Sequence, residues 1–267
     1  MKKNQKINFS RFNRTVFLDS SKVEEIKKWN ATGVIDGVTT NQMIMLKDGI
    51  KPSEYEKVIK AICREMKGKP VSIELTDSTA SPEAMVKEAK RLDALADNIV
   101  VKVPLIPETD KSLWVISQLA KLNIAVNITT IMTFEQMVMS ILAARNCKRL
   151  SFVSIFWGRS VEDHKIYRSK SNFETKYPKV GPESDVNKDV KILVQEVARF
   201  LKEGNYENPK IIVGSLRNAS QAGEAIAAGG NIPTIPPAIL EAMLFSQRSI
   251  ETIAQFDEAW KELQKKK

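Results

Sequence analysis

The feature that most constrains the fold is a regular alternation of short β-rich runs with helical patterns along the chain. The runs are rich in valine, isoleucine, threonine and phenylalanine, residue types that favour strands. Eight of them occur, at residues 16–19, 37–39, 71–75, 99–103, 125–129, 151–156, 211–215 and 233–235. Between them, apolar residues keep helical spacing, as at 55–62 and 190–201. Strands that alternate with helices are joined by parallel crossover connections.

Helix-start signals lie in the segments between the runs. Ser21, Ser53 and Thr133 are each followed three residues later by Glu or Gln, which predicts three capping boxes. Ser81 precedes a proline, which predicts a helix with Pro82 in its first turn.

Eight strand–helix units in 267 residues are typical of a (β/α)8 TIM barrel. A doubly wound open sheet is the alternative, although it usually has five or six strands and a glycine-rich first turn. No linker or change of composition marks a second domain. We therefore expect a single barrel domain over residues 1–267, with a basic N-terminal tail and a C-terminal helix.

Composition excludes several classes of site. Cys63 and Cys147 form no C-x-x-C pair and are read as reduced thiols of a cytoplasmic protein. His164 is the one histidine, so a metal site that needs a histidine pair is excluded and we expect no metal. Neither the dinucleotide-binding motif GxGxxG nor the P-loop motif GxxxxGK(S/T) occurs, and we expect no cofactor. No apolar run is long enough to span a membrane, and no apolar segment follows the basic N-terminus as in a secretory signal.

The chain carries a net charge of +9, from 41 basic and 32 acidic residues. Part of this excess lies in the two ends, where solvated tails account for it. Nucleic-acid binding would require a basic stripe with interleaved aromatic residues, and the sequence has none. A small anionic substrate fits the remaining charge equally well.

Lys102 is the one charged residue of its β-rich run. Alternate residues of a strand face opposite sides, so Ile99, Val101 and Val103 share one face and Lys102 shares the other with Val100. A lysine inside an apolar strand is costly unless it is paired or functional. Burial favours the uncharged amine, which is the nucleophile in Schiff-base chemistry. The alternative is an outward-pointing lysine whose stem lies along the surface.

Polar residues near the carboxyl ends of other runs favour the catalytic interpretation. Glu74 faces away from the apolar residues of its run, and so do Asn127 and Thr129. Further polar residues near the carboxyl ends of runs are Asp19, Asn41, Ser154 and Ser215. Barrel active sites form at this end of the strands. A structural polar network is the alternative reading.

The sequence motifs resemble those of the transaldolase family, in particular its small branch that also contains fructose-6-phosphate aldolases. The similar segments follow in family order and run from Leu18 to Trp260. They are LDSS at 18–21, GVTTN at 37–41, VVKVP at 100–104, NITT at 127–130, VSIFWGR at 153–159, GSLR at 214–217, IPPA at 235–238 and the pair Phe256 and Trp260. The resemblance implies a (β/α)8 barrel, no metal, and a ketose bound as a Schiff base on Lys102.

Roles for individual residues follow from their positions in these motifs. Asp19 would move the proton of the hydroxyl whose loss breaks the carbon–carbon bond. Glu74 would act, through a water held by Thr129, as acid and base in imine formation. The dihydroxyacetone part would be held by Asn41, Asn127 and Ser154. The substrate phosphate would be bound by Arg159, Ser215 and Arg217.

Two positions bear on the choice between transfer and simple aldol cleavage. Family transaldolases have Glu and Phe where the aldolase relatives have Gln and Tyr, and this chain has Glu74 and Phe156. That combination favours transfer of a dihydroxyacetone unit between sugar phosphates. An aldolase, or a transaldolase for an unusual sugar, is the alternative, because this chain departs from the family pattern at Gln42-Met43, Ile155 and Trp157.

Residues 157–188 break the strand–helix rhythm and are expected to form a long loop, which either covers the active site or is a surface insertion. For partners, we expect small-molecule sugar phosphates and further copies of the chain in a homo-oligomer, with no nucleic acid and no membrane. A non-catalytic sugar-phosphate-binding barrel is the other functional class. The joint presence of Lys102, Asp19 and Glu74 argues against it.

Overall fold

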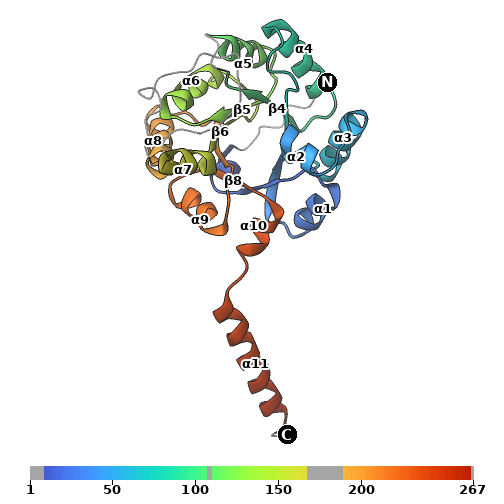
Figure 1. Cartoon of the computed structure of the whole chain (residues 1–267), viewed down its shortest axis with the longest axis vertical. Coiled ribbons are helices and arrows are strands. Elements are labelled where there is room, and N and C mark those ends of the chain that lie inside the picture. Colours follow the sequence, from blue (N-terminus) through green and yellow to red (C-terminus); the bar gives the residue numbers. More distant parts are fainter. Residues whose placement is uncertain (1–8, 107–109, 167–188, 266–267) are drawn as a thin grey trace.

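A closed barrel of eight parallel strands forms the centre of the computed structural model, which describes residues 9–106, 110–166 and 189–265 (Figure 1). The strands are β1 (Val16–Asp19), β2 (Ile35–Thr39), β3 (Val71–Glu74), β4 (Ile99–Pro104), β5 (Val126–Ile131), β6 (Phe152–Phe156), β7 (Lys210–Gly214) and β8 (Ile232–Ile235). Each pairs with its sequence neighbours, and β1 closes the ring against β8. The predicted TIM barrel is confirmed, and the open doubly wound sheet is wrong.

Helices follow the strands and surround the barrel (Figure 1). They are α1 (Val23–Ala31), α2 (Gln42–Lys47), α3 (Tyr55–Glu65), α4 (Pro82–Asp93), α5 (Lys111–Lys121), α6 (Phe134–Ala144), α7 (Trp157–Ile166), α8 (Val190–Glu203), α9 (Ala219–Ala227), α10 (Pro237–Ala242) and α11 (Gln247–Lys265). Two short 3-10 helices also occur, η1 (Phe9–Asn13) and η2 (Pro52–Glu54). The main core lies between the strands and the helices. The helix α8 contributes the buried apolar residues of its helical periodicity to this core, namely Val190, Leu193, Val194, Val197 and Leu201.

A second, smaller apolar cluster fills the amino-terminal half of the barrel interior. It contains Phe17 of β1, Val100 of β4 and Phe152 of β6, and Phe12 of η1 joins it from outside the barrel. The rings of Phe17 and Phe152 pack edge to face, with their centroids 5.5 Å apart. This cluster closes one end of the barrel, so polar inward-facing residues collect at the other end.

Gly37 of β2 makes room for this packing. A Cβ at this position would lie 2.5 Å from the ring of Phe17. Because Phe17 is fully buried, its ring has no space into which to move, and the inner layer requires a glycine here.

Two of the predicted helix starts are confirmed. The Thr133 side chain accepts a hydrogen bond from Gln136 N in a complete capping box. Ser81 caps α4 by accepting from Ala84 N at 3.2 Å, with Pro82 at the first helical position.

The capping boxes predicted at Ser21 and Ser53 are wrong. The Ser21 hydroxyl instead donates to Asp48 Oδ2 at 2.7 Å, and α1 begins after Lys22 without a side-chain cap. Ser53 lies inside η2, so the chain is already helical where the cap was expected. A contact with a distant segment thus replaced the cap at Ser21, and an earlier helical turn replaced the cap at Ser53.

The expectation of a loop over 157–188 is wrong for its first ten residues, which form α7. The helix begins directly after β6 because Trp157 is buried, with 1% exposure, and Gly158 N donates to the Ser215 carbonyl oxygen at 3.1 Å. The remainder, residues 167–188, lies outside the described residues, so the proposed cover of the site stays a prediction.

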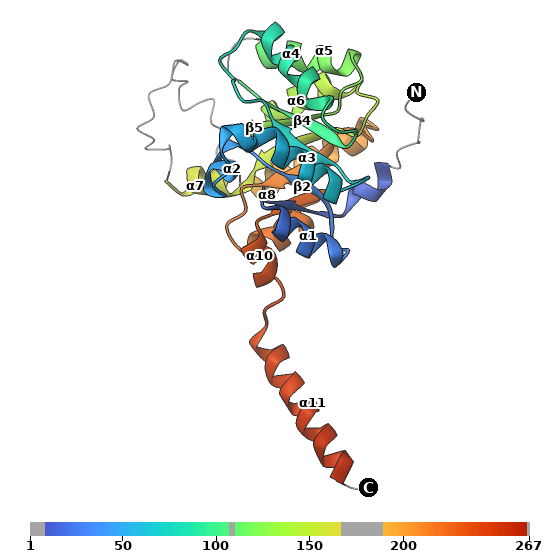
Figure 2. The same ribbon diagram turned by 90° about the vertical axis from the view of Figure 1, so that its right-hand side faces the viewer.

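The C-terminal helix α11 projects from the barrel and contacts no other helix in either view (Figures 1 and 2). None of its side chains is buried. Among the described helices, α11 included, none combines the length and apolar character that crossing a membrane requires.

Cys63 and Cys147 are free thiols, which agrees with the prediction that they form no disulfide, and both are buried. Burial raises the pKa of the Cys63 thiol to about 12, and burial also raises the pKa of Cys147. Both residues therefore stay protonated at neutral pH, which argues for a packing role.

Candidate active site

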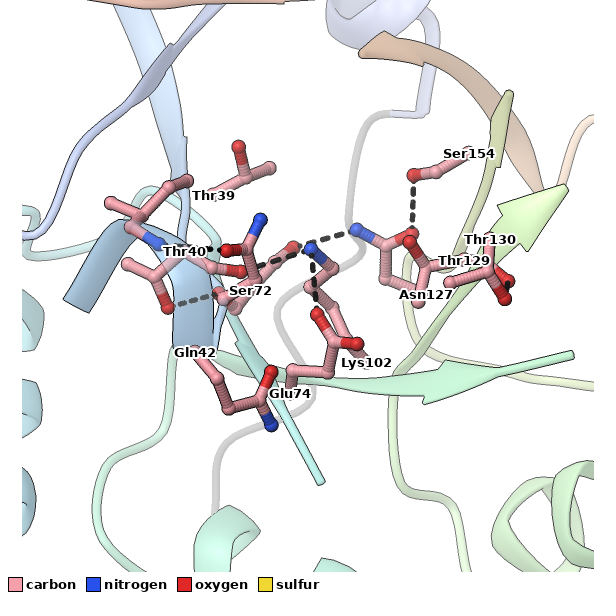
Figure 3. Close-up of polar contacts among 12 residues, drawn as sticks. Thr39, Thr40, Gln42, Ser72, Glu74, Lys102, Asn127, Thr129, Thr130 and Ser154 are labelled. Carbon is pink, nitrogen blue, oxygen red and sulfur yellow. Dashed lines mark hydrogen bonds and ion pairs between the residues drawn. The ribbon is translucent and has the colours of Figure 1, made fainter. Parts of the chain in front are cut away.

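The candidate site lies inside the barrel, at the carboxyl ends of the strands (Figure 3). Side-chain alternation places it there: on β4, Val100 belongs to the inner apolar cluster, and Lys102, two residues further on, is the next inward-facing residue. The same period brings Glu74 of β3 beside Lys102, and the strand register pairs these two residues directly.

Lys102 is only 4% exposed, so the surface alternative is wrong. Its Nζ donates a hydrogen bond to the Thr40 carbonyl oxygen at 2.9 Å (Figure 3). It also lies 3.3 Å from Glu74 Oε2. A buried ammonium is tolerated when a carboxylate and a carbonyl surround it in this way. Glu74 is close enough to take a proton from the amine and release it as a nucleophile.

Asp19 ends β1 and faces the same interior. Its Oδ1 accepts a hydrogen bond of 2.6 Å from the Thr39 hydroxyl, and the Thr234 hydroxyl lies 2.5 Å from that of Thr39. Burial raises the pKa of the Asp19 carboxyl, while the charge of Lys102 and the Thr39 hydrogen bond act in the opposite direction. A carboxyl with a raised pKa can exchange protons nearer neutral pH.

Asn127 and Ser154 form the opposite wall of the site (Figure 3). The Ser154 hydroxyl donates to Asn127 Oδ1 at 2.6 Å, and Asn127 Nδ2 donates to the Ser72 hydroxyl at 3.1 Å. All three side chains are buried. These contacts fix the orientation of the Asn127 amide beside Lys102, its register partner on β4.

Thr129, two residues further along β5, has a fully buried hydroxyl without a hydrogen-bond partner among the described residues. A buried hydroxyl in this state costs free energy unless water or a ligand satisfies it. It is therefore the kind of group that binds a water molecule or a polar substrate atom.

The other predicted binding residues lie near the mouth of the barrel. Asn41 follows β2 and caps α2, where its Oδ1 accepts from Ile44 N at 2.9 Å. Phe156 is the last residue of β6, two positions beyond Ser154, and is partly exposed. The register places Phe156 opposite Gly214, the residue before Ser215.

The three residues predicted to bind phosphate follow the carboxyl ends of two neighbouring strands: Arg159 follows β6, and Ser215 and Arg217 follow β7. Ser215 has a φ of 61°, and its carbonyl oxygen accepts from Gly158 N, which ties the start of α7 to the loop after β7. Arg217 Nε donates to Glu162 Oε1 at 3.0 Å. Arg159 is exposed on the first turn of α7. These residues therefore come from adjacent segments, joined by the Gly158–Ser215 hydrogen bond, at the rim of the barrel and not in its interior.

The sequence interpretation missed Thr39, Thr40, Ser72 and Thr234. Three of them could have been found, because Thr39, Ser72 and Thr234 have the inward parity of Gly37, Glu74 and Ile232 on their strands. Thr40 contributes a carbonyl oxygen, and no side-chain pattern signals that.

The interior combines one amine, two carboxyl groups and several hydroxyl and amide groups that hydrogen bonds hold in place. An amine with an adjacent proton acceptor can add to a carbonyl carbon and form an imine. The second carboxyl, Asp19, then stands ready for a separate proton transfer.

Comparison with known proteins identifies the family. The sequence model described as "Transaldolase/Fructose-6-phosphate aldolase" matches residues 16–267. A protein of Dehalococcoides mccartyi named "Probable transaldolase" is 31% identical over 250 residues, which cover 94% of this chain and 99% of that protein. A protein of Methanococcus maripaludis with the same name is 34% identical over 244 residues, which cover 91% of this chain and 96% of that protein.

Solved structures support the architecture alone. A 2,3-dimethylmalate lyase aligns with a TM-score of 0.53 and 12% identity, covering 96% of this chain and 82% of that one. Dihydrodipicolinate synthase from Rhodopseudomonas palustris aligns with a TM-score of 0.52 and 12% identity, covering 84% of this chain and 70% of that one. At such identities only the fold is shared. The match of the family's sequence model to nearly the whole chain, together with the relatives above 30% identity, shows that this chain belongs to the transaldolase/fructose-6-phosphate aldolase family.

Proposed function

We propose that the protein is a transaldolase that transfers a dihydroxyacetone unit from a ketose phosphate to an aldose phosphate through a Schiff base on Lys102. The observation that carries the proposal is the position of Lys102 Nζ, buried inside the barrel and 3.3 Å from Glu74 Oε2. Family membership supports the reaction class, and the named relatives support transfer.

The proposed reaction begins when Lys102 gives up a proton to Glu74 and attacks the ketose carbonyl carbon. The carbinolamine loses water to give a protonated imine, with Glu74 acting through a water on the Thr129 hydroxyl, which has no hydrogen-bond partner in the described part of the chain. Asp19 then removes the proton of the hydroxyl on the far carbon of the bond that breaks, and this carbon becomes the aldehyde carbonyl. The electron pair of that bond moves into the imine, the aldehyde leaves, and an enamine of dihydroxyacetone remains on Lys102.

The remaining residues of the proposal hold the substrate. Asn127 and Ser154 are already oriented by each other's hydrogen bond, so they can bind the hydroxyl groups of the dihydroxyacetone part without rearrangement. Asn41, at the mouth, is assigned to the same part. The phosphate is assigned to Arg159, Ser215 and Arg217 at the rim of the barrel.

Two features favour transfer over hydrolytic release. Glu74 and Phe156 are the residues that transaldolases carry where the aldolase relatives have Gln and Tyr. Phe156 has no hydroxyl, so it cannot give a proton to the enamine while the acceptor aldehyde is awaited.

Reductive trapping tests the proposal directly. Borohydride added with fructose 6-phosphate is expected to attach the sugar carbon skeleton to Lys102, as shown by peptide mass spectrometry. Lys102→Arg keeps the charge but is expected to abolish labelling, because arginine does not form the imine at useful rates. Lys210→Arg is the matched control, since Lys210 is also largely buried in a barrel strand but lies at the opposite end, bonded to Asn13. Labelling that persists in Lys102→Arg would contradict the proposal.

We also propose that the chain assembles with further copies of itself through α11. One face of this helix carries large apolar residues that are each more than half exposed, namely Ile250, Ile253, Phe256, Trp260 and Leu263. Helices in proteins gain most of their stability from packing of an apolar face, and α11 has 19 residues of which none is buried. The helix itself carries four acidic and three basic residues, so its own charge does not oppose packing of its apolar face against another copy of the chain.

Light scattering after size-exclusion chromatography tests this assembly. The native chain is expected to have a mass of several subunits, and a variant with Phe256→Ser and Trp260→Ser is expected to dissociate. A monomeric native protein, or an unchanged mass in the variant, would contradict it.

A further inference from the structure

Beside Arg159, Ser215 and Arg217, the residues assigned to the substrate phosphate, the rim of the barrel also carries a carboxylate. Glu162 lies on α7, one turn beyond Arg159, and its Oε1 accepts the hydrogen bond from Arg217 Nε at 3.0 Å. The proposed function assigns Arg217 to the substrate phosphate. One guanidinium therefore faces two possible anions, one from the protein and one from the substrate.

The backbone around Arg217 is fixed, so only its side chain can respond. Arg217 N donates to Gln221 Oε1 at 2.8 Å, and Asn218 caps α9 by accepting from Gln221 N at 2.9 Å. The side chain then runs across the start of α7, where a Cβ added to Gly158 would lie 3.1 Å from Arg217 Cγ and 3.2 Å from its Nε. Gly158 thus leaves the channel through which Arg217 reaches Glu162.

We propose that Glu162 is a specificity-determining residue, which competes with the substrate phosphate for Arg217 and weakens binding of phosphorylated sugars relative to unphosphorylated ones. This inference rests on the proposed function, in which Arg217 contacts phosphate. Glu162 acts on the phosphate end of the substrate and leaves the chemistry at Lys102 unchanged.

The exposure of the pair sets the size of the effect. The Arg217 and Glu162 side chains are 47% and 52% exposed, so their ion pair is weak and a doubly charged phosphate monoester can displace it. The carboxylate then remains near the bound phosphate and repels it through solvent. We expect such a screened repulsion to change phosphate affinity by about two- to fivefold, and to fade as salt is added.

Glu162→Gln separates charge from hydrogen bonding, because the glutamine Oε1 still accepts from Arg217 Nε while the negative charge is gone. The probe is inorganic phosphate as a competitive inhibitor of cleavage of fructose 6-phosphate. Its inhibition constant is expected to fall about two- to fivefold in Glu162→Gln at low ionic strength, with a smaller change in high salt. The rate of imine trapping with unphosphorylated dihydroxyacetone is expected to stay the same.

Glu203→Gln is the matched control. It removes the same charge from a 72%-exposed glutamate at the end of α8, which pairs with Arg199 at 3.9 Å. Its inhibition constant for phosphate is expected to equal that of the native protein. An equal fall in both variants would mean that net charge alone is responsible, and would overturn the inference.

Arg217→Ala, measured in parallel, separates failure of this inference from failure of the proposed function. An unchanged or raised inhibition constant in Glu162→Gln, with weakened phosphate inhibition in Arg217→Ala, would overturn the competition alone and leave the phosphate site in place. Unchanged phosphate inhibition in Arg217→Ala would overturn the phosphate site and the competition together. Thermal melts establish that each variant is folded.

Discussion

Gly158→Ala tests whether the start of α7 shapes the rim of the barrel. A Cβ at residue 158 would lie 2.0 Å from the Ser215 carbonyl oxygen, far inside any ordinary contact distance. That oxygen is backbone and cannot rotate away, so the first turn of α7 and the loop after β7 must separate. Their connecting hydrogen bond, Gly158 N to Ser215 O at 3.1 Å, is then lost.

The change in the free energy of unfolding follows from two destabilising contributions and one stabilising contribution. Overpacking costs about 1–3 kcal/mol and the lost hydrogen bond about 0.5–1.5 kcal/mol, while alanine in a helix regains about 1 kcal/mol over glycine. The free energy of unfolding is therefore expected to fall by about 0.5–3.5 kcal/mol. At this chain length that corresponds to a Tm lower by roughly 2–4 °C for each kcal/mol.

The functional consequence is local. The Arg217 side chain lies against Gly158, so phosphate inhibition is expected to weaken in Gly158→Ala. Borohydride trapping of unphosphorylated dihydroxyacetone on Lys102 is expected to persist, because Lys102 is held from β3 and the segment after β2, by Glu74 and Thr40. Differential scanning calorimetry, inhibition by phosphate and the trapping yield together measure these effects.

Gly223→Ala is the control, because it places the same methyl group in a helix where nothing lies within 4 Å. That variant is expected to be more stable by about 1 kcal/mol, with unchanged phosphate inhibition. If Gly158→Ala matched it in both Tm and phosphate inhibition, the close approach of α7 to the loop after β7 would not shape the rim, and the reasoning would be refuted.

Three further predictions concern individual site residues. Asp19→Asn is expected to abolish carbon–carbon cleavage and to raise Tm at pH 7. Burial raises the pKa of Asp19 above its unfolded value, so ionisation of this carboxyl destabilises the native state as pH rises. The gain in Tm is therefore expected to vanish below about pH 4, where Asp19 is protonated in both states. Phe156→Tyr is expected to raise dihydroxyacetone release without acceptor relative to transfer to erythrose 4-phosphate, and an unchanged ratio in an imine-forming variant would exclude residue 156 as the determinant. Arg217→Ala, which loses a charge-assisted contact of about 1.5–3 kcal/mol, is expected mainly to raise KM for phosphorylated sugars, and equal loss with unphosphorylated donors would contradict that role.

The choice of fold and the position of Lys102 could be predicted from the sequence, because both depend on local periodicity. A strand alternates its faces every residue, so Lys102 faces away from Ile99, Val101 and Val103, and the polar residues near the ends of other strands favoured the barrel interior for it. The same rule placed Glu74, Asn127 and Thr129, and a position near the carboxyl end of a strand indicated Asp19 and Ser154. The helix starts at Thr133 and Ser81 were equally local, since a capping side chain bonds within its own turn.

The predictions that were wrong and the site groups that were missed depend on contacts between distant segments. Ser21 forms a cap only if nothing better binds its hydroxyl, and Asp48, 27 residues later, does so. The Thr40 carbonyl that holds Lys102 comes from 62 residues away. The helical start of residues 157–166 depends on the Ser215 carbonyl and on burial of Trp157, neither of which the polar composition of that segment reveals.

The sequence by itself therefore determined the barrel, the family and the inward side chains, because the period of a strand and the order of motifs are written in the chain. Only the tertiary structure decided the electrostatics of the site. It paired Lys102 with Glu74, buried Asp19 enough to raise its pKa, and set Glu162 against Arg217. Charges and hydrogen bonds act over a few ångströms in space, and closing the barrel brings together groups that lie tens of residues apart in sequence.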